Sequence, residues 1–253
     1  MRQRSAGPHQ LQAIHSHPMN TFDLSELELA AERILRLDQL AQSEIERLAD
    51  LWSKRIAPDQ IEEEMLDVCD FKGTPTGISA PRWLCHLLGL RHRATHIILR
   101  SPQNLLVLQV RSRHKKDWPN QIDTSVGGHV RAGQSFLEAG LAEMEQELGL
   151  PANHQATWLA GGKLTKVGVP YERADYHPGT PPFRNKQINQ IYAGLLTPDG
   201  LARIRFQDGE VDTLYLCTDA EAEQLLAAGT RIAPGLAQSL PRYLAWHNQF
   251  IER

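Results

Sequence analysis

The stretch GGHVRAGQSFLEAGLAEMEQELGL, residues 127–150, decides the fold. It begins with a glycine pair, continues as an acidic amphipathic helix and ends at another glycine. Residues three and four apart on an α-helix share a face, so Glu143, Gln146 and Glu147 are predicted to point the same way. The apolar residues of the helix are predicted to point toward a core: Leu141, Met144 and Leu148.

The spacing of Glu143 and Glu147 indicates a metal site. Two carboxylates one helical turn apart repel each other unless a cation lies between them. A hard divalent ion, Mg²⁺ or Mn²⁺, prefers oxygen ligands and also binds phosphate oxygens. Gly127 and Gly128 let the backbone approach such an ion, and the Gly127 carbonyl is a candidate ligand. The alternative is a solvated acidic helix face.

The stretch resembles the Nudix box, G-x5-E-x7-R-E-U-x-E-E-x-G-U, where U is a bulky aliphatic residue. The matching residues are Gly128, Glu143, Met144, Glu147, Gly149 and Leu150. This resemblance implies an α/β fold, an α/β/α sandwich around a mixed sheet, over roughly residues 93–253. It also implies an Mg²⁺-dependent hydrolase that cleaves a nucleoside- or cofactor-type diphosphate linked to another group.

Three positions depart from the box. The first glutamate is replaced by Gln134 and the arginine by Ala142, and in the family these two side chains pair with each other. Gln146 replaces a metal-binding glutamate; its amide oxygen remains a candidate ligand, but the site carries less negative charge. A Nudix module that binds a nucleotide or a partner without catalysis is therefore the second hypothesis.

The segment FQDGEVDTLYL, residues 206–216, resembles the Nudix segment in which a loop glutamate precedes a strand. That likeness nominates Glu210 as a further ligand or as the general base that activates water. Without the family, Glu210 reads as an exposed turn carboxylate.

The region before the box resembles the isopentenyl diphosphate isomerase branch. The catalytic cysteine of that branch falls at Gly127, and its paired metal-binding glutamates fall at Asn185 and Gln187, so isomerisation is disfavoured. Two of its histidine ligands have counterparts in His129 and, less securely, His96, although each alone is more often structural. KKDWPNQID and DGEV also resemble Nudix proteins of thiamine diphosphate metabolism.

Basic and aromatic residues before the glycine pair are candidates for binding the substrate. Arg111 and Lys116 could neutralise a diphosphate, although a solvated hairpin end is the default interpretation of such a cluster. Trp118 could stack on a ring or could instead form a packed corner.

The chain divides into a flexible tail (1–20), a helical N-terminal extension (21–92) and the Nudix domain (93–253). A helix is predicted to begin after Asp23, a short one at Pro58 that includes Met65 to Val68, and the last one at Pro241. Two roles stay open for the N-terminal helices, covering the substrate cleft or building a homodimer. Strand-like runs are predicted in THIIL, NLLVLQV, NQIYAGLL and VDTLYLCT, and a hairpin or long loop is predicted near Leu159 to Pro182. The segment 161–184 is an expected place for substrate specificity.

Composition limits the partners. The net charge of −3 gives no basic field for a nucleic acid polymer. No run of about eighteen apolar residues indicates a membrane span, and no apolar run near the N-terminus indicates a signal peptide. Three cysteines without CxxC spacing favour free thiols, so a cytoplasmic protein is expected. The small-molecule diphosphate substrate is what the Nudix resemblance implies.

Overall fold

The computed structural model describes residue 25 and residues 41–179, 181–207 and 209–251. The predicted tail (1–20) and the helix predicted after Asp23 therefore lie outside the described residues, apart from Ser25.

The N-terminal unit combines two helices with a β-hairpin. Its elements are α2 (Gln42–Ser53), the 3₁₀ turn η1 (Pro58–Gln60), β1 (Met65–Cys69), β2 (Pro75–Pro81) and α3 (Arg82–Leu88). The predicted helix from Pro58 to Val68 is wrong, because only one 3₁₀ turn forms before the chain pairs as β1 against β2. That pairing buries Leu66 against the apolar faces of the two helices, in a core with Trp52 and Leu84.

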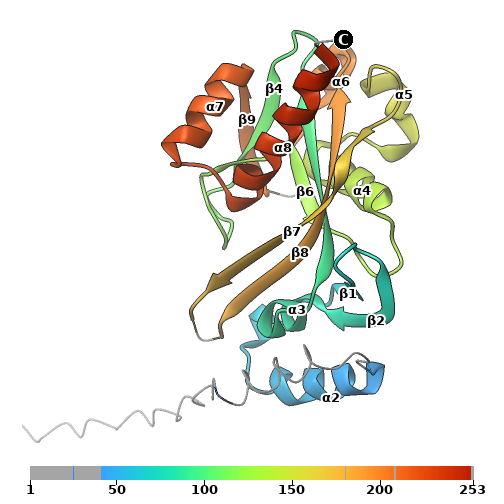
Figure 1. The fold of residues 1–253 in the computed structure, drawn as a ribbon, viewed down its shortest axis with the longest axis vertical. Coiled ribbons are helices and arrows are strands. Elements are labelled where there is room, and N and C mark those ends of the chain that lie inside the picture. The colour runs from blue at the N-terminus through green and yellow to red at the C-terminus, as the bar shows by residue number, and fades with distance from the viewer. Residues whose placement is uncertain (1–24, 26–40, 180, 208, 252–253) are drawn as a thin grey trace, which may run out of the picture.

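A seven-stranded mixed sheet forms the rest of the fold (Figure 1). Its strands are β3 (His92–Arg100), β4 (Leu106–Arg111), β5 (Ile122–Asp123), β6 (Val126–His129), β7 (Thr165–His177), β8 (Phe183–Leu195) and β9 (Val211–Cys217). The order is β5-β4-β3-β8-β7, with β6 beside β3 and β9 beside β4. Strands β3 and β8 are parallel, and the other pairs are antiparallel. The strand-like runs of the sequence are confirmed, and the segment expected as a hairpin or loop is the long β7–β8 hairpin.

Helices cover both faces of this sheet. They are α4 (Phe136–Leu148), the 3₁₀ turn η2 (Ala152–His154), α5 (Gln155–Trp158), α6 (Pro198–Arg203), α7 (Asp219–Ala228) and α8 (Pro234–Ile251). Alternate residues of a strand point to opposite faces. Ile97 accordingly packs in the core that holds Met144 of α4, whereas Ile98 packs in the core that holds Leu240 of α8. This two-faced packing confirms the predicted α/β sandwich preceded by a helical N-terminal region.

The start of the last helix differs from the prediction. Helix α8 begins at Pro234, and Pro241 lies inside it. A proline does favour the first helical turn, but the sequence offers two, and burial selects the earlier one. Leu236 and Leu240 are both fully buried against the sheet, so the first turns of α8 are held by packing. None of the helices in the described residues is both long enough and apolar enough to cross a membrane.

A buried ion pair joins the N-terminal unit to the sheet. Arg93 of β3 donates to Asp67 of β1 at 2.8 Å, and both side chains are largely buried. The other contacts of Asp67 reach the loop before α4 and strand β2: its carboxylate also accepts from the Gly133 N–H and the Ser79 hydroxyl. The N-terminal unit is thus fixed against the loop that leads into α4.

Candidate active site

A cleft of about 640 Å³ lies between the N-terminal unit and the sheet. Its walls come from the segment before β1, from α3, α4 and the β4–β5 loop, and from the ends of β7 and β8. The N-terminal unit therefore supplies part of the cleft wall.

Helix α4 is held rigidly at both ends. Ser135 and Glu138 form a capping box: the Ser135 hydroxyl accepts from the Glu138 N–H, and the Glu138 carboxylate accepts from the Ser135 N–H. Gly149 ends the helix in the left-handed region at φ 67°, which glycine adopts without strain. These local signals fix the rotation of α4 and so the direction of its carboxylates.

Glu143 and Gln146 line the cleft, whereas Glu147 lies behind its wall. The side chain of Glu143 lies directly over Gly128, where a Cβ would overlap the carboxylate. Glu147 is only 3% exposed, and its carboxylate accepts from the Gln109 amide of β4 at 3.1 Å. The two carboxylates that were predicted to share one face of the helix therefore differ in environment: Glu143 lines the cleft, and Glu147 is buried one turn away.

The environment of Glu143 is electrostatically unfavourable for a carboxylate. Its pKa is raised to about 7, first by burial and then by the negative charges of Glu64 and Glu210, with Arg131 and Arg82 offsetting part of the effect. A nearby dication would remove this penalty, and glutamate and amide oxygens are ligands that Mg²⁺ and Mn²⁺ accept. The residues present therefore fit the divalent ion that the box implies.

Glu210 lines the same cleft as Glu143 of α4. Its carboxylate forms an ion pair with Lys115 at 2.6 Å, and its charge acts on Glu143. Glu210, which without the family reads as an exposed turn carboxylate, therefore lines the cleft and is held to the β4–β5 loop by its ion pair with Lys115.

The three candidate substrate-binding residues all line the cleft, and each already has a protein contact. Arg111 donates to Asp123 at 3.1 Å and to the Asp117 carbonyl. Lys116 is exposed and lies 4.0 Å from the Asp59 carboxylate. Trp118 packs edge-on against His177 of β7, with the ring centroids 5.4 Å apart.

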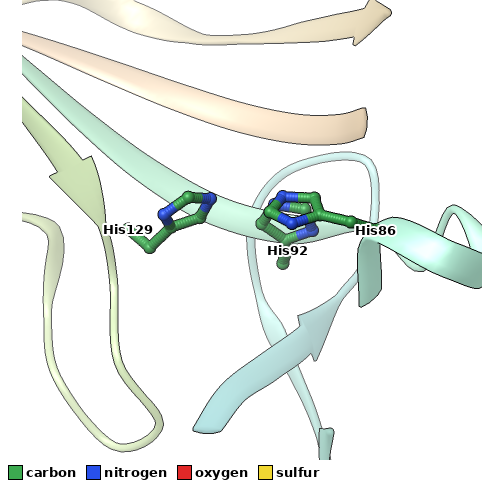
Figure 2. A group of neighbouring side chains, drawn as sticks. All are labelled: His86, His92 and His129. Carbon is green, nitrogen blue, oxygen red and sulfur yellow. The ribbon is translucent and has the colours of Figure 1, made fainter. Parts of the chain in front are cut away.

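The two candidate histidines have different neighbours. His129 lies beside His86 and His92 (Figure 2), and each of the three rings offers a nitrogen within 4.8 Å of the other two. His96 lies apart from this group and bonds to the Ser239 hydroxyl at 2.5 Å. The structure therefore does not place His96 in the group that contains His129, although both residues line the cleft.

The amides expected in place of the isomerase glutamates lie close to this histidine group. Gln187 contacts the His129 ring at 3.0 Å, and Asn185 donates to Asp175. The isomerase-type carboxylates are absent from both positions.

Sequence reasoning also missed the contribution of the N-terminal unit to the cleft. Glu64 accepts from Arg82 at 3.2 Å and from Arg131 at 3.1 Å, so its carboxylate links α3 to the loop before α4. The segment that contains Glu64 was expected to be helical, and that expectation did not indicate that Glu64 and Arg82 lie near the acidic helix. The alternating pattern of MLDVC before a GTPTG turn was the available signal for a hairpin.

The family profile of the NUDIX domain matches residues 90–236, more than half of the chain, and the protein belongs to this family. Nudix hydrolase 3 of Arabidopsis thaliana is 35% identical over 155 residues, which are 60% of this chain and 19% of that protein. An uncharacterized Nudix hydrolase of Streptomyces coelicolor is 37% identical over 87 residues, 34% of this chain and 48% of that protein. The aligned segments thus span between about a fifth and a half of these relatives.

A solved structure shows the same fold. The crystal structure of DR0079 from Deinococcus radiodurans has a TM-score of 0.52 and 21% sequence identity, and the match covers 71% of this chain and 98% of that one. At this identity the likeness extends to the fold alone.

Proposed function

We propose that the protein is a hydrolase, dependent on Mg²⁺ or Mn²⁺, that cleaves a nucleoside- or cofactor-type diphosphate linked to another group. The observation that carries this proposal is the Glu143 carboxylate, held over Gly128 in a cleft where burial, and then the charges of Glu64 and Glu210, raise its pKa to about 7. Such a carboxylate is poised to gain a cation. The NUDIX family membership supports the same reaction class.

Glu143 and Glu147 are the proposed metal-holding carboxylates. Gln146 lines the same cleft and offers a neutral amide oxygen, and the Gly127 carbonyl is the proposed backbone ligand. When bound, a divalent ion screens the charge of phosphate oxygens and lowers the pKa of water. Glu147 must leave its contact with Gln109, or share it, to take part, which gives Gln109 a role in positioning that carboxylate.

Glu210 is the proposed general base. It would accept the proton of the attacking water, and the ion pair with Lys115 holds it at the cleft wall. The ammonium group of Lys115 neutralises the negative charge of the Glu210 carboxylate in the ion pair. On the same reasoning Lys115 can shift toward the phosphate when the Glu210 carboxylate takes up the proton.

Cationic side chains around the cleft suit a diphosphate. Arg111 and Lys116 are the proposed substrate-binding residues predicted from sequence, and Arg82 and Arg131 of the cleft wall add two guanidinium groups. Guanidinium groups bind phosphate oxygens in pairs, so they would fix the orientation of a diphosphate beside the metal-holding carboxylates. Trp118 is proposed to contact the organic part of the substrate, for which a thiamine-type ring is one candidate.

A non-catalytic binding module is the second candidate, and Gln146 favours it. Exchanging a carboxylate for an amide lowers the charge of the site and with it the affinity for a divalent ion. Isomerisation is disfavoured, because Gly127 supplies no thiol and residues 185 and 187 supply no carboxylates.

The test is a hydrolysis screen of the purified full chain with Mg²⁺ and separately with Mn²⁺. The panel holds nucleotides, nucleotide sugars, dinucleoside polyphosphates and thiamine diphosphates, and the readout is released phosphate or pyrophosphate. Glu147→Gln is the site variant. Glu145→Gln is the matched control, because Glu145 lies on the same helix and is exposed.

Metal-dependent turnover that is retained in Glu145→Gln and lost in Glu147→Gln supports the hydrolase and identifies its substrate class. If Glu147→Gln leaves turnover unchanged, the assignment of Glu147 to a metal-binding catalytic site is wrong. If no substrate is cleaved but panel members still raise the Tm, the binding module is correct.

A further inference from the structure

His96 is a buried polar residue of the cleft that the proposed hydrolysis does not use. It lies in the middle of β3, paired with Gly127 of β6 and with Ile191 of β8, and it is 6% exposed. Its Nδ1 atom bonds to the Ser239 hydroxyl of α8 at 2.5 Å. An imidazole held through one nitrogen in this way can present the other nitrogen, Nε2, to a ligand.

The hydrogen bonds around Ser239 decide which nitrogen of His96 carries the proton. The Ser239 hydroxyl donates its single hydrogen to the Gly235 carbonyl at 2.9 Å, because a carbonyl oxygen can only accept. Its oxygen therefore accepts from both other neighbours, Nδ1 of His96 and the Tyr171 hydroxyl at 2.8 Å. Burial lowers the pKa of His96 to about 4, so the ring is neutral at pH 7. The hydrogen is thus on Nδ1, and the lone pair is on Nε2.

Two glycines leave the Nε2 edge of this ring open to the cleft. Carbon Cδ2 of His96 lies 3.2 Å from the point that a Cβ of Gly127 would occupy, and Cε1 lies 3.4 Å from the corresponding point at Gly235. Nε2 lies between these two carbons in the ring, and all three residues line the cleft. Within the described ranges, no residue forms a hydrogen bond with this nitrogen. A side chain at either glycine position would cover it.

The same opening holds a second acceptor. Oδ1 of Asp123 lies 3.3 Å from the Cβ point of Gly235, and Nη1 of Arg173 reaches that point at 3.5 Å as a donor. The other carboxylate oxygen of Asp123 accepts from Arg111, which is a proposed phosphate-binding residue. The opening therefore adjoins the proposed place of the diphosphate and faces the organic group attached to it.

We infer that His96 is a specificity-determining residue, whose Nε2 accepts a hydrogen bond from an amino or hydroxyl group on the organic part of the substrate. This inference rests on the proposed function for the presence of a diphosphate in the cleft. A buried acceptor that a ligand leaves unpaired weakens binding, whereas a matching donor satisfies it. A site built around such a group rejects analogues that lack the donor. Ser239 and Tyr171 act as positioning residues, because they fix the tautomer of His96.

Binding of matched ligand pairs to the metal-free full chain tests the inference without turnover. ADP and inosine diphosphate differ in an amino group, as do thiamine diphosphate and oxythiamine diphosphate, and ADP and 2′-deoxyADP differ in a hydroxyl group. Calorimetry in the presence of a chelator gives the Kd of each ligand. We expect the member with the donor to bind roughly tenfold more tightly in at least one pair, which also shows whether the donor is an amine or a hydroxyl.

Equal binding within every pair, or no binding of any probe, overturns the inference. The outcome for the proposed function is separate, because the hydrolysis screen measures turnover and this experiment does not. Hydrolysis together with equal binding in every pair would refute the role of His96 alone.

Two variants locate the discrimination. His96→Phe keeps a planar ring but removes the acceptor, and Gly235→Ala places a methyl group over the opening, 3.3–3.5 Å from its nearest neighbours. Both should reduce the preference within the pair to less than about twofold. His154→Phe is the matched control, because His154 is exposed, and it should keep the full preference. An unchanged preference in His96→Phe would show that another residue recognises the donor.

Nitrogen NMR of the labelled wild type provides a test that depends on no variant. Long-range proton–nitrogen spectra report which nitrogen of each imidazole is protonated. We expect the His96 proton on Nδ1 and the lone pair on Nε2 at about pH 7. A proton on Nε2 would make this nitrogen a donor and would refute the inference.

Discussion

Replacing Glu143 by glutamine should stabilise the metal-free protein, although it removes a proposed metal ligand. The pKa of Glu143 is raised from 4.5 to about 7 by burial and by the charges of Glu64 and Glu210. Between these two pH values the folded state holds a proton that the unfolded state has lost, so the stability of the wild type falls as pH rises. A shift of this size corresponds to roughly 3 kcal/mol once the pH exceeds the folded pKa.

Glutamine imitates the protonated carboxyl group and has no charge to lose. We therefore expect Glu143→Gln to be more stable than the wild type by roughly 3 kcal/mol at about pH 8, and by almost nothing at about pH 4. Urea unfolding in the presence of a chelator, across this pH range, measures the difference. Glu145→Gln is the control, since an exposed substitution on the same helix should change stability by less than about 0.5 kcal/mol.

Adding Mg²⁺ should reverse the order of stability, because the wild type gains binding energy that the variant lacks. A Glu143→Gln variant that is less stable than the wild type at about pH 8 without metal would refute the reasoning. So would a stability difference that does not change with pH, because it would show that the effect is not electrostatic.

Two further predictions test the packing around the cleft. Gly128→Ala should lower kcat/KM with Mg²⁺ by roughly 100-fold, because the new methyl group displaces the Glu143 carboxylate; a retained kcat/KM contradicts the placement of that side chain. Asp67→Ala should cost about 3–5 kcal/mol in urea unfolding, because it leaves Arg93 buried without its partner. Asp50→Ala breaks an exposed pair and should cost less than about 1 kcal/mol, and equal losses would contradict the importance of burial.

Much of the fold could be predicted because its signals are local. The capping box at Ser135 and the glycine at 149 lie within a turn of the helix that they define, and α7 likewise lies between a capping box at Thr218 and Gly229. The strands β3, β4 and β9 follow from short apolar runs. Where two local signals competed, as at Pro234 and Pro241, only burial of α8 against the sheet decided between them.

Of the candidate site, only the arrangement of residues within the single acidic helix could be predicted from the sequence. The sequence placed Glu143 one turn from Glu147, but it did not reveal that Glu147 is buried against Gln109 of another strand. It also could not show that the charge of Glu64 acts on Glu143, because Glu64 precedes a β-hairpin in a segment that the apolar spacing predicted to be helical. Long-range contacts of this kind are set by how the N-terminal unit packs on the sheet.

By itself the sequence determined the acidic helix, its glycine-bounded ends and the family to which it belongs, since these depend on residues within a few positions of each other. The tertiary structure alone decided that His86, His92 and His129 meet, and that the N-terminal unit forms a wall of the cleft. The physical reason is that side chains from separate elements gain their burial, their hydrogen bonds and their shifted pKa values only when those elements have packed together.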